Sequence, residues 1–348
     1  MYYPIKFIPV YKDYIWGGRY FENFNRELPS GILAESWEVS CHKNGVSIVA
    51  NGDLKGKTLP EIIKADSKNI LGTRFPADCR ELPLLVKLID AKDRLSIQVH
   101  PDDIYAAVYE GGLGKNELWY IMNAIPGAKL VVGLKTGTTK DIFSKAIKEN
   151  SIEAHLQEIE VRPGDVINIP AGLVHSIGAG IVLAEIQQTS DITYRVFDYN
   201  RVDCNGVGRP LHLKKALDVI RFEEGQRNVK FEGVNVKLDE CCNKTFYLAN
   251  KYFACERYSI NGSYTEKCDG RTFCVFICLG GNGNIETQNM TVSFKTGEAV
   301  LIPAALGEYK LIGQFKALKT YMPDFSKDIV LPMRNAGCSE ADILKVLS

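Results

Sequence analysis

Hydrophobic and polar residues alternate in short runs along much of this chain. Clear examples are residues 129–134, 165–169, 273–279 and 299–302, each bounded by turn-forming residues. A period of two places successive side chains on opposite faces of an extended strand. Many short strands separated by close turns are typical of a sandwich or barrel, so the predicted fold class is mainly β.

A smaller number of segments carry apolar residues at helical spacing, often behind a Ser, Thr or Asp start signal. The predicted helices are residues 59–70, 101–109, 142–148 with an extension through 152–156, 211–222 and 339–347. Between 222 and 339 the pattern predicts no strong helix. The helices therefore decorate the β-structure as an insertion.

An internal repeat indicates two β-units. The segment from Gly164 to Pro170 reads Gly, acidic residue, four-residue strand, Pro, and the segment from Gly297 to Pro303 repeats that order. A length of 348 residues also favours two domains over one. With the polar stretch after Phe222 as the boundary, we predict a domain at 1–225, a second at 226–325 and a C-terminal tail at 326–348.

The first copy of the repeat continues to a histidine, giving Gly164, Pro170, Gly172 and His175 in the spacing G-x5-P-x-G-x2-H. This spacing resembles the second motif of the cupin barrels. The first cupin motif usually holds His-x-His followed by Glu, and the chain offers Gln98-Val99-His100 and then Glu117. Two residues that are two apart on a strand point the same way, as paired ligands require.

Together, Gln98, His100, Glu117 and His175 form a set of nitrogen and oxygen donors without thiolates. Such a set suits zinc or another divalent first-row ion with an open coordination position. Taken singly, His100 could be a turn histidine, Glu117 a solvated charge and His175 a core histidine, but their combined spacing favours a metal site.

The second copy has Ala305 and Glu308 where the first has Gly172 and His175, and no histidine follows His212. We therefore expect the second barrel to hold no metal.

Longer segments around these motifs resemble type I mannose-6-phosphate isomerases, particularly the short bacterial form, which belongs to the cupin superfamily. The resemblance is strong over residues 1–215, and Asn116 stands where the family has proline. It is carried by Trp16-Gly17-Gly18, Glu35–Glu38, Pro83–Ala91, Leu95–Asp103, Lys115-Asn116-Glu117 and Pro170–Tyr199.

The resemblance implies two jelly-roll cupin barrels and a zinc ion, one per chain, on Gln98, His100, Glu117 and His175. It also places the family's active-site cations on Lys115 and Arg195 and its active-site serine on Ser96.

The implied reaction interconverts mannose 6-phosphate and fructose 6-phosphate through an enediolate, which a divalent ion and Arg195 would stabilise. Lys87, Ser96 and Lys115 are candidates to bind the phosphate. The base stays open among metal-bound water, Lys115 and a carboxylate that is not a ligand. The alternative role for Arg195 is an ion pair with Asp198 or Asp203.

Composition favours small molecules as partners. Lys plus Arg equals Asp plus Glu at 42 each, and no dense basic run indicates nucleic-acid binding. The first residues show no secretory signal and no apolar run is long enough to cross a bilayer, so we expect a cytoplasmic monomer or homodimer without a membrane partner. Ten scattered cysteines without a CxxC pair are expected to be reduced.

Two other function classes fit a cupin. A cupin dioxygenase would hold iron or copper, but it normally uses more histidines and has no need of phosphate-binding cations. A sugar-sensing or storage bicupin would have no use for Lys115 and Arg195 beside a metal. Metal analysis with an assay on mannose 6-phosphate would separate the three classes.

Overall fold

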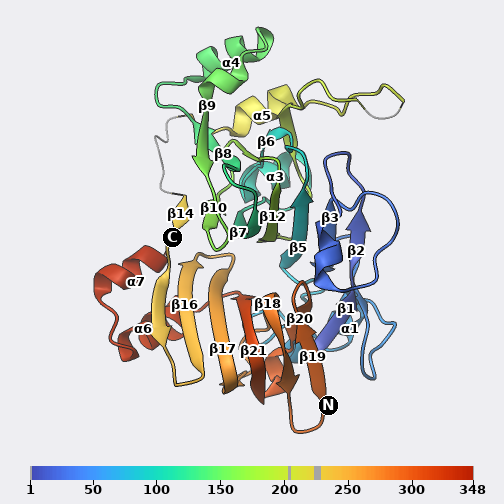
Figure 1. Cartoon of the computed structure of the whole chain (residues 1–348), viewed down its shortest axis with the longest axis vertical. Coiled ribbons are helices and arrows are strands. Elements are labelled where there is room, and N and C mark those ends of the chain that lie inside the picture. The colour runs from blue at the N-terminus through green and yellow to red at the C-terminus, as the bar shows by residue number, and fades with distance from the viewer. Residues whose placement is uncertain (1, 203–204, 223–228, 348) are drawn as a thin grey trace.

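Strands dominate the chain, as the alternation predicts, and they pair into three antiparallel sheets (Figure 1). The computed structural model describes residues 2–202, 205–222 and 229–347. The predicted boundary between residues 225 and 226 lies outside these residues, and the division into domains stays a prediction.

The largest sheet is built mostly from the C-terminal part of the chain, but β1 and β4 from the N-terminal part extend its edge beside β20. In spatial order its strands are β15 (Val234–Lys237), β16 (Cys242–Ala249), β17 (Ala254–Lys267), β21 (Glu308–Tyr321), β18 (Cys274–Glu286), β20 (Ala299–Ile302), β1 (Ile5–Ile8) and β4 (Ile48–Val49), with β19 (Thr291–Lys295) on β18.

The other two sheets come mainly from the first two thirds of the chain. The seven-stranded sheet has the order β14 (Lys230–Phe231), β10 (Val166–Ile169), β7 (Glu117–Ala124), β12 (Ile181–Gln188), β5 (Leu84–Ala91), β3 (Glu35–Val39) and β2 (Val10–Lys12). The five-stranded sheet has the order β13 (Tyr194–Phe197), β6 (Ile97–Val99), β11 (His175–Ile177), β8 (Lys129–Leu134) and β9 (Leu156–Glu160).

The seven- and five-stranded sheets form a jelly-roll sandwich, which we call the first unit. Their facing side chains share one buried cluster, in which Trp119 of β7 and Leu183 of β12 meet Leu130 of β8 and Ile177 of β11. Burying these apolar faces against each other is the main favourable term that holds the sheets together.

A row of glycines crosses the long strands of the largest sheet. Gly262 on β17, Gly313 on β21 and Gly283 on β18 lie side by side in the ladder. At Gly313 the φ angle is 137° and an added Cβ would lie 2.6 Å from the Cα of Gly283. Only glycine allows the strands to approach this closely. The largest sheet has a buried core of its own, and we call it the second unit.

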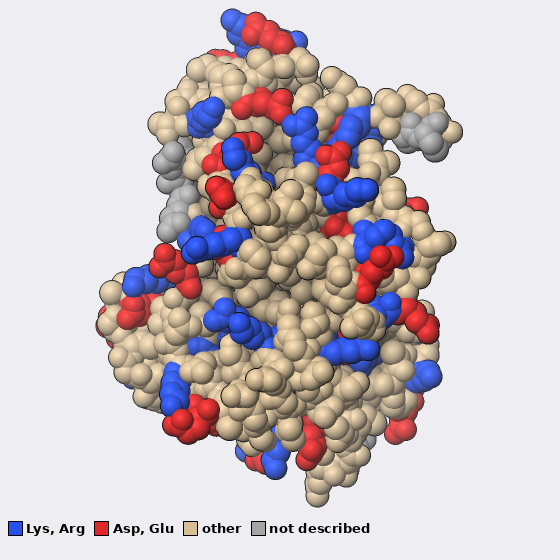
Figure 2. Space-filling view, in the orientation of Figure 1, with Lys and Arg blue, Asp and Glu red and all other residues tan. Residues whose placement is uncertain are grey.

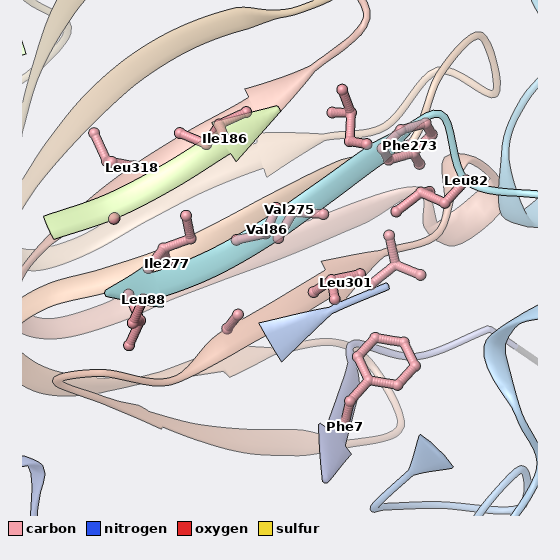
Figure 3. Packing of buried hydrophobic residues seen from close by; sticks show 14 of the residues in the cluster. Phe7, Leu82, Val86, Leu88, Ile186, Phe273, Val275, Ile277, Leu301 and Leu318 are labelled. Atoms are coloured by element: carbon pink, nitrogen blue, oxygen red, sulfur yellow. The ribbon is translucent and has the colours of Figure 1, made fainter. Parts of the chain in front are cut away.

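A shared hydrophobic core joins the two units. Figure 3 shows Val86 and Leu88 of β5 packed close to Val275 and Ile277 of β18, with Leu318 nearby, and all five side chains are buried. This core places the seven-stranded sheet directly against the largest sheet.

The helices lie around the sheets (Figure 1). The α-helices are α1 (Leu59–Ala65), α2 (Ser67–Ile70), α3 (Asp103–Tyr109), α4 (Lys140–Lys148), α5 (Leu213–Val219), α6 (Leu331–Asn335) and α7 (Glu340–Val346). Short turns of other helix types are η1 (Tyr20–Phe24), η2 (Ile152–His155), η3 (Ala304–Leu306) and the π-type η4 (Phe325–Val330).

Two helix predictions need correction. The helix expected over 59–70 breaks at Asp66, whose φ and ψ of −155° and 63° are not helical. The structure also has η4 and α6 before residue 339, where no helix was expected. Tertiary packing explains them, because Ile329 and Met333 are buried in the core of the second unit.

All nine cysteines within the described residues are free, as expected, while Cys204 lies outside those residues. On the face shown in Figure 2, acidic and basic side chains are interspersed. Within the described part of the chain, we find no helix with the length and apolar character needed to cross a membrane.

Candidate metal centre and active site

Strand pairing in the first unit brings the predicted ligands to one place. His175 opens β11 directly opposite Gln98 on β6, and Glu117 is the first residue of β7. His100 follows the last residue of β6. Before His175 the chain turns at Gly172, whose φ is 87°, a conformation that glycine adopts without strain.

Three of these side chains form a tight buried group. The potential ligand atoms of His100, Glu117 and His175 all lie within 4.8 Å of one another. The Nε2 atom of His100 is 3.3 Å from Oε1 of Glu117, and Nε2 of His175 is 3.9 Å from Oε2. Each side chain is at most 1% exposed.

Backbone carbonyls orient both imidazoles. Nδ1 of His100 lies 2.8 Å from the carbonyl oxygen of Ile192, and Nδ1 of His175 lies 2.8 Å from that of Leu173. Because a carbonyl only accepts, each Nδ1 carries the proton and each Nε2 presents a lone pair toward Glu117. Metal-binding histidines usually have this arrangement.

The protonation states also suit a cation. Burial lowers the pKa of His175 to about 3 and, together with the charge of Lys115, lowers the pKa of His100. Burial alone would raise the pKa of Glu117, but the positive charge of Lys115 holds it well below its usual value. Two neutral imidazoles and one carboxylate are the protonation states that a metal ion requires.

Both carboxylate oxygens of Glu117 are buried, and within the described residues Oε2 has no hydrogen-bond partner, while Oε1 faces the Lys115 ammonium at 2.6 Å. A buried carboxylate oxygen normally has a hydrogen-bond partner. The unpaired Oε2 and the two imidazole lone pairs fit a divalent cation bound between them.

Gln98 borders this group. Its amide nitrogen is 3.3 Å from Nε2 of His175, and its amide oxygen accepts a hydrogen bond from the Ser96 hydroxyl at 3.2 Å. Rotation of the amide would turn the oxygen toward the group.

Lys115 points into the same group from the loop before β7. Its Nζ lies 2.6 Å from Oε1 of Glu117 and 3.4 Å from Nε2 of His100. The side chain is buried. Its positive charge therefore balances the carboxylate.

Arg195 lies on β13 opposite Gln98, and both side chains line a cleft next to the group. Within the described residues Arg195 forms no ion pair, and its Nε has no hydrogen-bond partner. The alternative pairing with Asp198 is not formed, because Asp198 is bound by Arg201 at 2.5 Å and by Arg209 at 2.6 Å. Asp203, the other alternative partner, lies outside the described residues.

Lys87 also lines the cleft, but two carboxylates hold it. Its Nζ is 3.3 Å from Glu185 and 3.5 Å from Glu35. Burial alone would lower its pKa, yet these carboxylates raise it, so the ammonium stays charged.

Sequence reasoning assigned no role in the site to the other charged residues of the cleft, which are Glu35, Glu185, Asp191 and Arg209. The sequence could have indicated Glu185 as a site residue, because it is a charged residue inside the otherwise uncharged strand β12. Charged side chains are rarely buried without a specific reason. Trp119 donates a hydrogen bond to Glu185 at 2.8 Å. Burial and the nearby Glu117 raise the pKa of Glu185.

In the second unit, Glu308 is exposed at the first position of β21, and Ala305 lies in the turn before it. The absence of metal from this unit stays a prediction.

Comparison with known proteins gives the family. Residues 5–116 match the catalytic domain of type I phosphomannose isomerase, and residues 243–322 match the cupin domain of mannose-6-phosphate isomerase.

Full-length relatives agree with these two matches. The chain is 36% identical to mannose-6-phosphate isomerase ManA of Bacillus subtilis over 325 residues, covering 92% of this chain and 99% of the relative. It is 32% identical to mannose-6-phosphate isomerase of Streptococcus mutans over 312 residues, covering 88% and 94%.

Solved structures share the fold over nearly their whole length. The crystal structure of mannose 6-phosphate isomerase from Bacillus subtilis has a TM-score of 0.84 and 32% identity, covering 91% of this chain and 99% of that one. A putative mannosephosphate isomerase from Archaeoglobus fulgidus, with a TM-score of 0.73 and 20% identity over 92% and 98%, supports the fold alone. Sequence motifs, fold and relatives thus agree, and the chain belongs to the family of type I mannose-6-phosphate isomerases.

Proposed function

We propose that this chain interconverts mannose 6-phosphate and fructose 6-phosphate through an enediolate, with one zinc ion held by Gln98, His100, Glu117 and His175. The observation that carries this proposal is the buried group of His100, Glu117 and His175 beside a cleft lined by cationic side chains. The group has the neutral imidazoles and the carboxylate that a divalent ion needs.

A divalent ion bound there would supply positive charge next to the sugar oxygens. Arg195 is the second source of positive charge. Its guanidinium lines the cleft, is not neutralised by an ion pair within the described residues, and stays protonated at working pH. We assign it the stabilisation of negative charge that develops on the substrate oxygens.

The phosphate needs hydrogen-bond donors away from the reacting carbons. Ser96, Lys87 and Lys115 were the candidates from sequence, and all three line the cleft. Lys87 is already held between Glu35 and Glu185. The Ser96 hydroxyl donates to Gln98 and would become free for the phosphate once the Gln98 amide oxygen turns toward the metal. Arg209 also lines the cleft and joins this set of candidates.

Proton transfer between C1 and C2 needs a side chain that can carry a proton. Lys115 lies nearest to the proposed ligands, with its Nζ 2.6 Å from Glu117. Among the carboxylates that are not proposed ligands, Glu185 is the favoured candidate for the base, because its pKa is raised. The pH dependence of kcat in Lys115→Met and Glu185→Gln separates them, because the variant that lacks the base loses the corresponding limb of the profile.

The test of the whole proposal is a coupled assay with mannose 6-phosphate on purified protein, combined with elemental analysis. We expect about one equivalent of zinc per chain, loss of turnover after chelation and recovery when zinc returns. Turnover that persists in protein free of metal would contradict the proposed mechanism. Absence of turnover with zinc bound would contradict the proposed reaction.

A further inference from the structure

Asn116 lies between Lys115 and Glu117, where the family pattern has proline. Its backbone and side-chain polar groups form hydrogen bonds to other parts of the first unit. Its backbone N–H and its side-chain Nδ2 both donate to Oε1 of Gln188, at 3.0 and 2.7 Å. Its Oδ1 accepts from the backbone N–H of Ala171 at 3.0 Å. Proline has neither the N–H nor the amide and could form none of these three bonds.

These bonds connect three segments that carry the site. Asn116 precedes β7, Gln188 is the last residue of β12, and Ala171 belongs to the turn that leads to His175. The backbone N–H of Gln188 also donates to the carbonyl oxygen of Asn116 at 3.2 Å. Asn116 therefore fixes the position of Glu117 relative to His175.

Gln188 is also hydrogen-bonded to Asp103 at the start of α3. Its Nε2 donates to Oδ1 of Asp103 at 2.9 Å, and the backbone N–H of Gly114 donates to the same oxygen at 3.0 Å. Asp103 therefore also holds the loop immediately before Lys115.

The other oxygen of Asp103 receives a bond from the second unit. Tyr252, in the turn between β16 and β17, donates its hydroxyl to Oδ2 of Asp103 at 2.6 Å. This turn is itself ordered, since the backbone N–H of Tyr252 donates to Oδ1 of Asn250 at 2.8 Å. Tyr252 lies within the segment that matches the family's cupin domain.

Asp103 is charged in this arrangement. Its partial burial alone would raise its pKa, but the hydrogen bonds from Tyr252, Gln188 and Gly114 lower it. Hydrogen bonds to an ionised acceptor are stronger than neutral ones. The Asp103 carboxylate therefore holds Gln188, Gly114 and Tyr252 firmly together.

We propose that Asn116 and Tyr252 are positioning residues, and that the second unit sets the pose of Lys115 and Glu117 through the connected bonds Tyr252–Asp103–Gln188–Asn116. Neither residue touches the reacting atoms in this assignment. Through Tyr252, the second unit would then help to position the site residues of the first unit. The assignment deepens the proposed function, and its activity readout rests on that function.

A purely structural role for Tyr252 would give a different result. The two units already share a large hydrophobic core, so loss of one hydroxyl would have a small effect on the stability of the folded chain. If Tyr252 only joined the units, its removal would lower the melting temperature slightly and leave the metal site unchanged.

The test uses the full chain with zinc as the probe, in Tyr252→Phe and Asn116→Ala. Tyr264→Phe is the matched control, because Tyr264 is a partly exposed tyrosine on β17 that takes no part in these bonds. Zinc affinity is measured by competition with a chelator. We expect it to fall about tenfold in Asn116→Ala, roughly threefold in Tyr252→Phe and not at all in the control.

The double variant tests whether the bonds act as one connected unit. Once Asn116 no longer holds Gln188, removal of the Tyr252 hydroxyl should add little, so the two losses in zinc affinity should combine to less than their product. Losses that multiply fully would overturn the connection between the residues. A Tyr252→Phe variant with the zinc affinity of the control would overturn the role of the second unit.

Steady-state kinetics provides the activity readout. In both variants, saturated with zinc, kcat should fall severalfold while KM for mannose 6-phosphate changes little. The reason is that Lys115 is displaced whereas the substrate contacts remain. A rise in KM without loss of kcat would contradict the assigned role. If the unaltered protein does not isomerise mannose 6-phosphate, the proposed function fails, while the zinc affinities still decide the inference.

Discussion

Nζ of Lys115 lies 2.6 Å from Oε1 of Glu117, and both side chains are buried in the first unit. The two residues are two positions apart, around the start of β7, and point into the same group. One positive charge thus balances the carboxylate that we assign as a zinc ligand. A zinc ion and the ammonium would repel each other across this short distance.

Replacement of Lys115 by methionine should separate metal binding from catalysis. We expect Lys115→Met to bind zinc at least as tightly as the unaltered protein, because a competing positive charge is removed. We expect kcat to fall about a hundredfold, because a group that moves a proton or contacts substrate is lost. Chelator competition and steady-state rates measure the two effects, with the exposed Lys129→Met as control. Unchanged turnover would remove Lys115 from the catalytic residues.

His175→Ala should lose zinc and activity together, because the remaining ligands cannot hold the ion in place. We expect zinc affinity to fall by about two orders of magnitude or more, with little bound metal after dialysis. His155→Ala is the control, since His155 lies in η2 outside the group. Full zinc content and turnover in His175→Ala would show that the ligands are misassigned.

The second unit offers a complementary control. Glu308 occupies the position that corresponds to His175 in the repeat and is exposed. Glu308→Ala should therefore keep about one equivalent of zinc per chain. A lost second equivalent would contradict the prediction that this unit holds no metal.

Arg195→Lys should fold normally and retain zinc but lose mainly kcat. The positive charge survives, whereas the planar fork that can contact two oxygens is lost, so we expect a decrease of about ten- to a hundredfold. Arg201→Lys is the control, because Arg201 binds Asp198 and does not line the cleft. A lower melting temperature with unchanged kcat per zinc-loaded molecule would indicate a structural role instead.

A buried ion pair in the second unit should control stability at acid pH. Nζ of Lys319 lies 2.6 Å from Oε2 of Glu266, and their side chains are 16% and 13% exposed. Burial alone would raise the pKa of Glu266, but Lys319 and Lys244 lower it. As the pH falls toward and below about 4.3, the unfolded chain binds more protons than the folded chain, so the free energy of unfolding should decrease.

Lys319→Met should weaken this pH dependence. Without its ammonium the pKa of Glu266 should rise toward its ordinary value, while Lys244 and the Tyr258 hydroxyl still act on the carboxylate, so less stability is lost on acidification. At neutral pH the variant should lose roughly 2 kcal/mol, because the carboxylate loses one charge-assisted hydrogen bond. Urea unfolding at about pH 7 and about pH 4 measures both effects. The double variant Lys319→Met with Glu266→Leu should recover most of the loss and show no such slope.

Local sequence patterns were enough to predict the class of fold and the proposed ligands. Alternation with a period of two predicts strands because the strand geometry is local, and the glycine and proline of the repeat mark turns for the same reason. The spacing Gln98-Val99-His100 already requires the first and last of these side chains to face one way. The family resemblance then supplied the reaction.

Other features depend on contacts between segments that are distant in the sequence. The additional helix at Leu331–Asn335 follows from the burial of Met333 rather than from local preference. At the break between α1 and α2, the Asp66 side chain accepts a hydrogen bond from the distant Tyr2. The places of Glu35, Glu185 and Arg209 in the cleft required the pairing of strands from separate parts of the chain.

The link between Tyr252 and Asp103 shows this limit most clearly. The two residues are 149 positions apart, and no local pattern relates them. A hydrogen bond depends on distances and angles that only the packed sheets define, whereas strand periodicity depends on neighbours along the chain. The ligands of the proposed site could therefore be predicted from sequence, and the residues that hold those ligands in position could not.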